Sequence, residues 1–190
     1  MISYAIDYSE RVFVPLPTDQ EITAESKKLL DAAAPLNVAR MFSGTGDMFA
    51  PIAGLIQAVF ETKGIDVKIR ELIILRTAKQ LNCPYEWHAN TQMAKNAGCT
   101  ADEVKAMGTD GPVSGLSDEI VLICRAVDEL TIDGSLEDET LTAMMKAFDV
   151  ITVRKLILMI SWFNLLSRFL NGCRVQLESG DHIGHRTSPV

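Results

Sequence analysis

The sequence predicts an all-α protein with seven to nine helices, and three observations support this fold class. Apolar residues recur every three or four positions in one segment after another. Helix-capping residues, glycines and prolines stand between these segments. No segment shows the sustained alternation of apolar and polar residues that is typical of a strand. Together these features predict a bundle of helices.

The segments follow one another in order along the chain. The expected helices cover residues 18–34, 37–42, 48–63, 66–82, 84–97, 100–107, 117–130, 135–148 and 151–171. Asp66 is suited to cap the fourth helix, and Pro84 is suited to the first turn of the fifth. Gly98 follows the end of that helix, and Gly172 is expected to end the last one. Residues 100–103 form a capping box for the sixth helix.

A chain of 190 residues is expected to form a single domain over residues 1–190. Its N-terminal arm, residues 1–19, contains Pro15 and Pro17 and is expected to lie on a neighbouring subunit or to be loosely ordered. The polar C-terminal tail, residues 179–190, is expected to be mobile or to lie on a partner.

Composition and charge exclude several classes of function. The net charge is −7 without a Lys/Arg cluster, which disfavours nucleic-acid and anionic-membrane partners. The most apolar stretch, residues 156–167, falls short of the roughly 20 residues that a membrane span needs, so it predicts a buried core helix. The N-terminus lacks the apolar core of a signal peptide. Four cysteines do not make a disulfide framework. A cytoplasmic protein with reduced thiols is expected.

The helix hairpin over residues 66–98 is the best candidate for a functional centre, and its first acidic residue is Glu71. This residue stands inside the apolar run 69–75, where burying a carboxylate costs several kcal/mol unless it is paired or protonated. The alternative is a solvent-facing stripe shared with Lys68 and Arg70. Taken alone, the residue slightly favours this alternative.

Cys83 stands at the start of the second helix of the hairpin, immediately before Pro84. The helix dipole and free N–H groups at this position stabilise a thiolate, although a free cysteine is more often a small buried hydrophobe. Helical spacing places a thiol, a carboxylate, an indole and an amide on one face; the residues are Cys83, Glu86, Trp87, Asn90 and Ala94. Glu86 could instead be only a favourable charge in the first turn of a helix.

The histidines are weaker candidates. His88 lies about 200° around the helix from Glu86, so it could bind the same substrate only in a pocket built from two subunits. Otherwise it is a surface residue. His182 and His185 stand three apart in the tail, where no cysteine or acid pair completes a ligand set. The sequence therefore predicts no metal site.

The hairpin resembles the carboxymuconolactone decarboxylase family, which includes alkylhydroperoxidase D-like proteins. The resemblance rests on residues 70–76, 82–90, 94–98 and 100–104, and residues 162–171 resemble the last core helix of the roughly 190-residue members. It implies an alkylhydroperoxidase D-like helical bundle. It also implies self-association as a dimer, trimer or hexamer, with pockets near subunit contacts.

Peroxidase members of this family carry a Glu, then a Cys-x-x-Cys pair, then a His four residues later. Here Glu71 and Cys83 fill the first two positions, whereas Glu86 replaces the second Cys and Asn90 replaces the His. No local disulfide can close without a thiol at position 86. Cys99 lies about 24 Å along the helix, beyond the roughly 7 Å Cα separation that a disulfide tolerates.

The sequence leaves open which cysteine could pair with Cys83 and whether the Cys83 thiol is ionised. Cys124 and Cys173 remain possible partners for Cys83. The charge of Glu86 disfavours a thiolate at Cys83, whereas the helix dipole favours one. The sequence does not decide between these two effects.

Three functions follow from the hairpin. The first is a cofactor-free acid–base enzyme of lyase or decarboxylase type acting on a small organic acid. In it Glu71 is the acid with a raised pKa, Glu86 stays ionised as base or anchor, and Tyr85, Trp87 and Asn90 shape the pocket. The second is a thiol-dependent peroxidase using Cys83 and an external thiol. The third is a non-catalytic oligomeric binding protein. None of them requires a cofactor.

Overall fold

The computed structural model describes residues 11–180 and 182–187, and over these residues it holds nine α-helices, a short 3₁₀ helix and no strand. The predicted all-α fold is confirmed. The elements are α1 (Ala24–Ala32), α2 (Asn37–Ser43), η1 (Gly46–Met48), α3 (Phe49–Phe60), α4 (Val67–Gln80), α5 (Pro84–Asn96), α6 (Ala101–Met107), α7 (Asp118–Ile132), α8 (Asp138–Ala147) and α9 (Val150–Cys173).

Helix α1 begins later than the sequence suggested. Glu21 accepts hydrogen bonds from the backbone N–H and the hydroxyl of Thr18, so residues 18–21 form a turn rather than a helix start. Thr23 caps the helix by accepting a hydrogen bond from the N–H of Ser26. The early polar residues therefore provide a turn, and the cap lies further along the chain.

Helix α9 ends differently from the expectation. Gly172 was expected to end it, but the helix includes this residue and continues to Cys173. Arg174 then adopts the left-handed conformation, with a φ of 55°, and its N–H bonds to the carbonyls of Asn171 and Leu170. These bonds satisfy carbonyls at the helix end, so no glycine is needed there.

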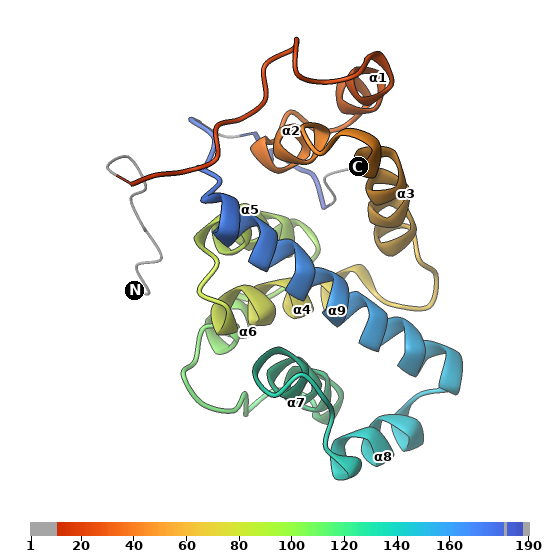
Figure 1. The fold of residues 1–190 in the computed structure, drawn as a ribbon. Helices are drawn as coiled ribbons and strands as arrows, with labels where there is room; N and C mark the ends of the chain where they lie inside the picture. The colour runs from red at the N-terminus through yellow and green to blue at the C-terminus, as the bar shows by residue number, and fades with distance from the viewer. Residues whose placement is uncertain (1–10, 181, 188–190) are drawn as a thin grey trace.

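Helix α4 lies at the centre of the fold and packs against α5, α6, α7 and α9. Figure 1 shows α9 crossing the molecule, with α7 and α8 at one side and the α1–α3 layer at the other. Helices α1, α2 and α3 pack chiefly on one another. The nine consecutive residues 70–78 of α4 are all buried. Helix α4 is therefore enclosed on every side, as expected for a helix at the centre of a bundle.

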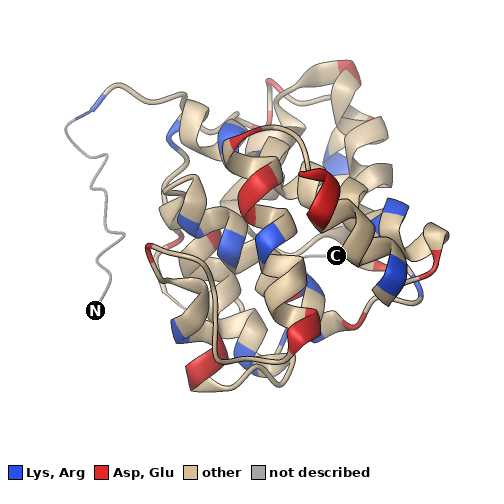
Figure 2. Ribbon diagram, turned by 90° about the horizontal axis from the view of Figure 1, so that it is seen from below, with Lys and Arg blue, Asp and Glu red and all other residues tan. Residues whose placement is uncertain are grey.

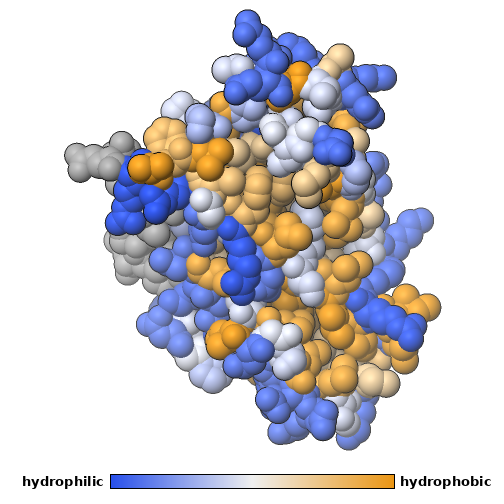
Figure 3. Space-filling view, viewed as in Figure 1, coloured by the Kyte–Doolittle hydropathy of each residue, from blue (hydrophilic) through white to orange (hydrophobic). Residues whose placement is uncertain are grey.

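Helix α9 is the most apolar long element. By length and composition alone it could cross a membrane, and it is the one such helix in the described part of the chain. Half of its apolar window is buried in the protein, and the core helix of a soluble protein passes the same test. Its outer face carries the exposed residues Ile151, Leu158 and Leu165. Figure 3 shows apolar side chains gathered on the side of the molecule that α9 crosses.

The described parts of the two terminal segments contact the body of the same chain. Residues 1–10 of the predicted arm fall outside the described residues. In its described part, the N–H of Val14 donates to the carbonyl of Cys173 at 3.0 Å.

The described part of the tail contacts its own chain, and the expectation that the tail is mobile or lies on a partner stays a prediction. Ile183 is buried in the core, and Asn96 of α5 donates to the carbonyls of Gly184 and Arg186.

Charged residues of both signs are interspersed over the helices (Figure 2). The single-domain organisation, the cytoplasmic location, self-association and the exclusion of nucleic-acid and membrane partners stay predictions.

Candidate functional site

A cavity of about 320 Å³ lies between the α1–α3 layer and helices α5 and α9. Aromatic side chains form much of its wall, and they include Phe42, Phe49, Phe60 and Trp162. Helix α5 contributes one face, made of Tyr85, Glu86, Ala89, Asn90 and Met93. The volume lies within the range of small-molecule sites, which are typically concave, mostly apolar and equipped with few polar groups.

Glu71 lies behind this cavity and is fully buried, so the alternative of a solvent-facing stripe with Lys68 and Arg70 is wrong. The reason is the position of α4 at the centre of the bundle, where residues 70–78 are buried on every side of the helix. Arg70 is also buried, and its Nε lies 3.2 Å from Oε1 of Glu71. The other carboxylate oxygen, Oε2, is buried and has no hydrogen-bond partner among the described residues.

Glu86 occupies the third position of α5, where the sequence left open a site residue or only a favourable first-turn charge. Its side chain is buried and lines the cavity. Asn90, one turn later, donates from Nδ2 to the backbone carbonyl of Glu86 at 2.9 Å and to Oε2 of its carboxyl group at 3.3 Å. Asn90 therefore fixes the orientation of this carboxyl group at the cavity wall.

The two buried carboxyl groups hold protons more tightly than ordinary glutamates. Burial raises the pKa of Glu71 to about 7, and Arg70 opposes part of that rise. Burial raises the pKa of Glu86 to about 8, and the charge of Glu71 adds to the rise. Since Arg70 stabilises the ionised form of Glu71, the proton of the pair resides chiefly on Glu86 at neutral pH.

The raised pKa of Glu71 agrees with the sequence-based expectation, whereas the raised pKa of Glu86 differs from it. Glu71 was expected to be the acid with a raised pKa and Glu86 the ionised base. Both pKa values are raised, and Glu86 is the more protonated group because it lacks an adjacent cation. Glu86 also lines the cavity, whereas Glu71 does not. A ligand in the cavity can therefore touch Glu86 but not Glu71.

Cys83 lies at the N-cap of α5 and is fully buried in the core, outside the cavity lining. Burial and then the charge of Glu86 raise the pKa of its thiol to about 12, and nearby backbone N–H groups only partly offset this. Between the helix dipole and the charge of Glu86 the sequence did not decide; desolvation has the largest effect and disfavours the thiolate. A reactive thiolate is disfavoured, which argues against the peroxidase hypothesis.

This burial predicts a slow reaction between Cys83 and thiol reagents. In the native protein at pH 8, Ellman's reagent should label the half-buried Cys173 first and leave Cys83 unlabelled until denaturant is added, because the thiolate is the attacking form. Peptide mass spectrometry after labelling identifies the modified residue. Fast labelling of Cys83, or a sulfenic acid on it after peroxide treatment, would contradict this prediction.

Tyr85 joins the cavity to the tail of the chain. Its hydroxyl donates to Oε1 of Glu178 and accepts from the N–H of Val38. The same carboxylate oxygen accepts from the N–H of Asn37. The first turn of α2 has no side-chain cap of its own, so these contacts cap it from α5 and the tail. They also attach the α1–α3 layer to the rest of the protein at the cavity.

Two residues predicted for the site lie elsewhere. Trp87 is half-buried between the two core clusters, and His88 is exposed; neither lines the cavity. The face of α5 that lines the cavity is turned by about one residue from the predicted face, which placed Cys83, Trp87 and Ala94 beside Glu86. Tyr85 and Asn90 do line it, as does Glu86.

Sequence reasoning missed the opposite wall of the cavity. The helices of the α1–α3 layer and Trp162 of α9 provide it. Their apolar spacing is the same as that of ordinary core helices, so no sequence signal distinguishes a cavity wall from a filled core.

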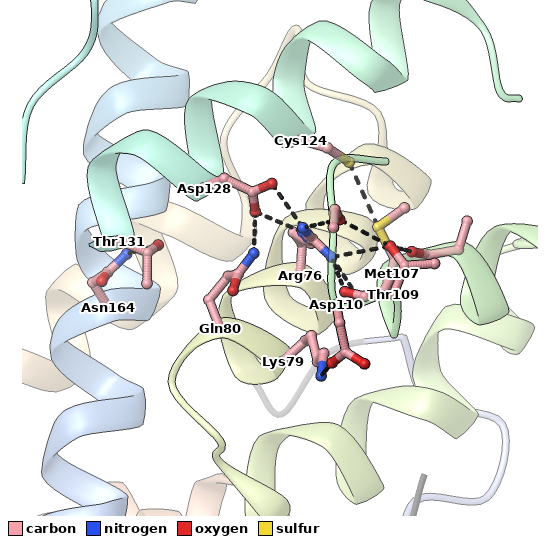
Figure 4. A network of polar contacts seen from close by, with 12 residues as sticks. Arg76, Lys79, Gln80, Met107, Thr109, Asp110, Cys124, Asp128, Thr131 and Asn164 are labelled. Atoms are coloured by element: carbon pink, nitrogen blue, oxygen red, sulfur yellow. Dashed lines mark hydrogen bonds and ion pairs between the residues drawn. The ribbon is translucent and has the colours of Figure 1, made fainter. Parts of the chain in front are cut away.

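A second buried network supports α4 on the side away from the cavity (Figure 4). Arg76 is almost fully buried and makes a two-pronged ion pair with Asp128 of α7, at 2.6 and 2.7 Å. Its guanidinium also donates to the carbonyls of Met107, Thr109 and Gly111. These contacts fix α4 against α7 and the loop after α6, and so help to hold Glu71 in place.

The central part of the chain matches a known protein family. Residues 46–122 match the family model described as "Carboxymuconolactone decarboxylase family". The matched segment runs from η1 to the start of α7 and includes Glu71, Cys83 and Glu86. A comparison with curated proteins found no match.

Proposed function

Residues 46–122 match the carboxymuconolactone decarboxylase family, and on that premise we propose that the chain is a member of this family and a cofactor-free acid–base enzyme in which Glu86 exchanges a proton with a small organic substrate. One observation carries this proposal. Glu86 is the buried carboxyl group among the described residues that line the cavity. A pKa of about 8 suits a group that must both accept and return a proton near neutral pH.

The proton step needs only this one carboxyl group at the substrate. In its ionised form, Glu86 removes a proton from a substrate carbon beside a carbonyl group, and the C–H electron pair moves toward the carbonyl oxygen. The carboxyl group so formed then returns the proton to another atom of the substrate. Glu86 is regenerated, and no electrons leave or enter the substrate. Asn90 orients the carboxyl group throughout.

Glu71 acts through Glu86 as a positioning residue, since it does not line the cavity. Its charge raises the pKa of Glu86 and thereby keeps a proton available at the cavity. Decarboxylation of a small organic acid is one narrower form of such chemistry, and it stays a prediction. The peroxidase hypothesis lacks a comparable observation because Cys83 is buried away from the cavity.

Solvent deuterium exchange tests this proposal over a whole class of substrates at once. A panel of small carbonyl compounds is incubated with the protein in D₂O, and NMR follows the loss of C–H signals beside the carbonyl group. We expect Glu86→Gln to lower the exchange rate about 100-fold or more. Glu139→Gln, on the exposed surface of α8, is the control and should leave the rate unchanged.

A second variant separates the role of Glu71 from a purely structural one. Glu71→Gln should move the midpoint of the pH–rate profile to lower pH, because the charge that raises the pKa of Glu86 is gone. Equal exchange by wild type and Glu86→Gln, with ligand binding retained, would favour the non-catalytic binding protein instead.

A further inference from the structure

The chemical make-up of the cavity indicates which ligands it accepts. Most of its lining is apolar, and the ionisable groups among the described lining residues are Tyr85, Glu86 and Glu61. None of these described residues is a Lys, Arg or His. Glu61 is exposed at the rim, where it accepts a hydrogen bond from Gln57. The charge that a ligand meets in this cavity is therefore zero or negative.

The positive charge of Arg70, which lies beside the cavity-lining residue Phe60, does not change the charge that a ligand meets in the cavity. The guanidinium of Arg70 lies against the ring of Phe60, 4.6 Å from its centroid, and Phe60 lines the cavity. Yet its nitrogens are directed to the carboxylate of Glu71 and to the carbonyls of Phe60 and Thr187. Arg70 thus donates its hydrogen bonds to acceptors within the protein. A carboxylate ligand would be desolvated without a counter-charge and would face Glu86, an arrangement that costs several kcal/mol.

The polar groups at the α5 wall suit an uncharged oxygen. A protonated carboxyl group at Glu86 can donate one hydrogen bond to a carbonyl oxygen. The aromatic and aliphatic walls then contact the rest of the ligand, where burial of apolar surface provides the binding free energy.

From this lining we infer that the site takes an uncharged carbonyl compound, a ketone or an ester with an apolar body, and rejects the matching carboxylates. The inference rests on the proposed function, in which Glu86 contacts the substrate, and it narrows the class of substrate. It differs from the small organic acid that the sequence suggested. The reason for the difference is that the cavity wall, which comes largely from α1–α3, supplies no cation.

A matched pair of probes tests this inference by binding alone. 4-Phenylbutan-2-one and 3-phenylpropanoate have nearly the same shape, and they differ in that one ends in a neutral methyl ketone and the other in a carboxylate. Titrations at pH 7 followed by protein NMR give the two dissociation constants. We expect the ketone to bind at least about tenfold more tightly, because the carboxylate finds no counter-charge. Equal binding, tighter binding of the carboxylate, or no binding of the ketone overturns the inference.

Variants on helix α3 locate the binding site. Ala53→Phe fills the cavity and should abolish ketone binding, whereas Ala58→Phe, on the exposed side of the same helix, should not. Gln57→Lys places a cation at the rim and should strengthen carboxylate binding. If Gln57→Lys leaves carboxylate binding unchanged, the missing counter-charge is not the reason for rejection and the inference fails.

The failure of the inference is distinguishable from the failure of the proposed function. Ketone binding without deuterium exchange contradicts the acid–base enzyme and leaves the ligand class intact. Exchange on carboxylates combined with no ketone binding contradicts the ligand class and leaves the acid–base enzyme intact.

Discussion

Raising the pH from 5 to 8.5 should lower the free energy of unfolding by on the order of 6 kcal/mol, because the folded protein holds protons that the unfolded chain releases. Burial raises the pKa of Glu71 to about 7 and that of Glu86 to about 8, against an ordinary value of 4.5. In the unfolded chain both groups lose their protons near pH 4.5. Stability is therefore highest at the low end of this range and falls until the pH passes the folded-state values.

Other carboxyl groups do not obscure this trend. Asp19, Asp110 and Asp149 have lowered pKa values because of ion pairs or hydrogen bonds. Such groups lose their stabilising effect only below their ordinary range. Their effect is thus complete by pH 5. The decline between pH 5 and 8.5 belongs to the buried pair.

Urea unfolding at a series of pH values measures this decline, and Glu86→Gln is the decisive variant. A glutamine keeps the shape and the contact with Asn90 but has no proton to hold. It should match the wild type near pH 5 and be the more stable protein at pH 8.5. Glu139→Gln should keep the wild-type slope. A flat wild-type profile, or an unchanged slope in Glu86→Gln, would show that Glu86 is not a buried acid.

Arg76→Met should lower the free energy of unfolding by about 3–5 kcal/mol, the usual effect of removing one partner from a buried ion pair. The side chain of Arg76 is 1% exposed. Its loss leaves Asp128 with only the hydrogen bond from Gln80 among its described contacts, and it removes the guanidinium donor from the carbonyls of Met107, Thr109 and Gly111. Chemical denaturation monitored by circular dichroism gives the value.

Arg125→Met is the matched control for this prediction. Arg125 pairs with Glu129 and Glu139, but its side chain is 43% exposed, so its loss should cost about 1 kcal/mol or less. Arg76→Lys keeps the charge and loses the two-pronged geometry, so it should lie between wild type and Arg76→Met. Equal effects of Arg76→Met and Arg125→Met would refute the buried-network account.

Much of the fold could be predicted because its signals are local. Asp66 and Thr100 cap their helices as expected, since a cap bonds to N–H groups two or three residues away. The errors at the ends of α1 and α9 are also local, because Thr23 and Arg174 provided alternatives to the expected start and stop signals.

The candidate site could be predicted only in part. The family segment, and Glu71 and Glu86 as candidate site residues, followed from the sequence of one hairpin. Its chemistry did not follow, because the pKa of a carboxyl group depends on what surrounds it in all directions. Burial of Cys83 likewise depends on the packing of the core, which lies outside the local spacing of α5.

The sequence by itself determined the helical fold class, the order of the helices and the family hairpin. The tertiary structure alone decided that α4 has no solvent-facing side, that α5 turns Glu86 and Asn90 rather than Trp87 toward the cavity, and that the α1–α3 layer closes the opposite wall. The physical reason is the separation along the chain over which each effect acts. Helix periodicity and capping act over three or four residues, whereas desolvation and cavity shape depend on segments far apart in the chain.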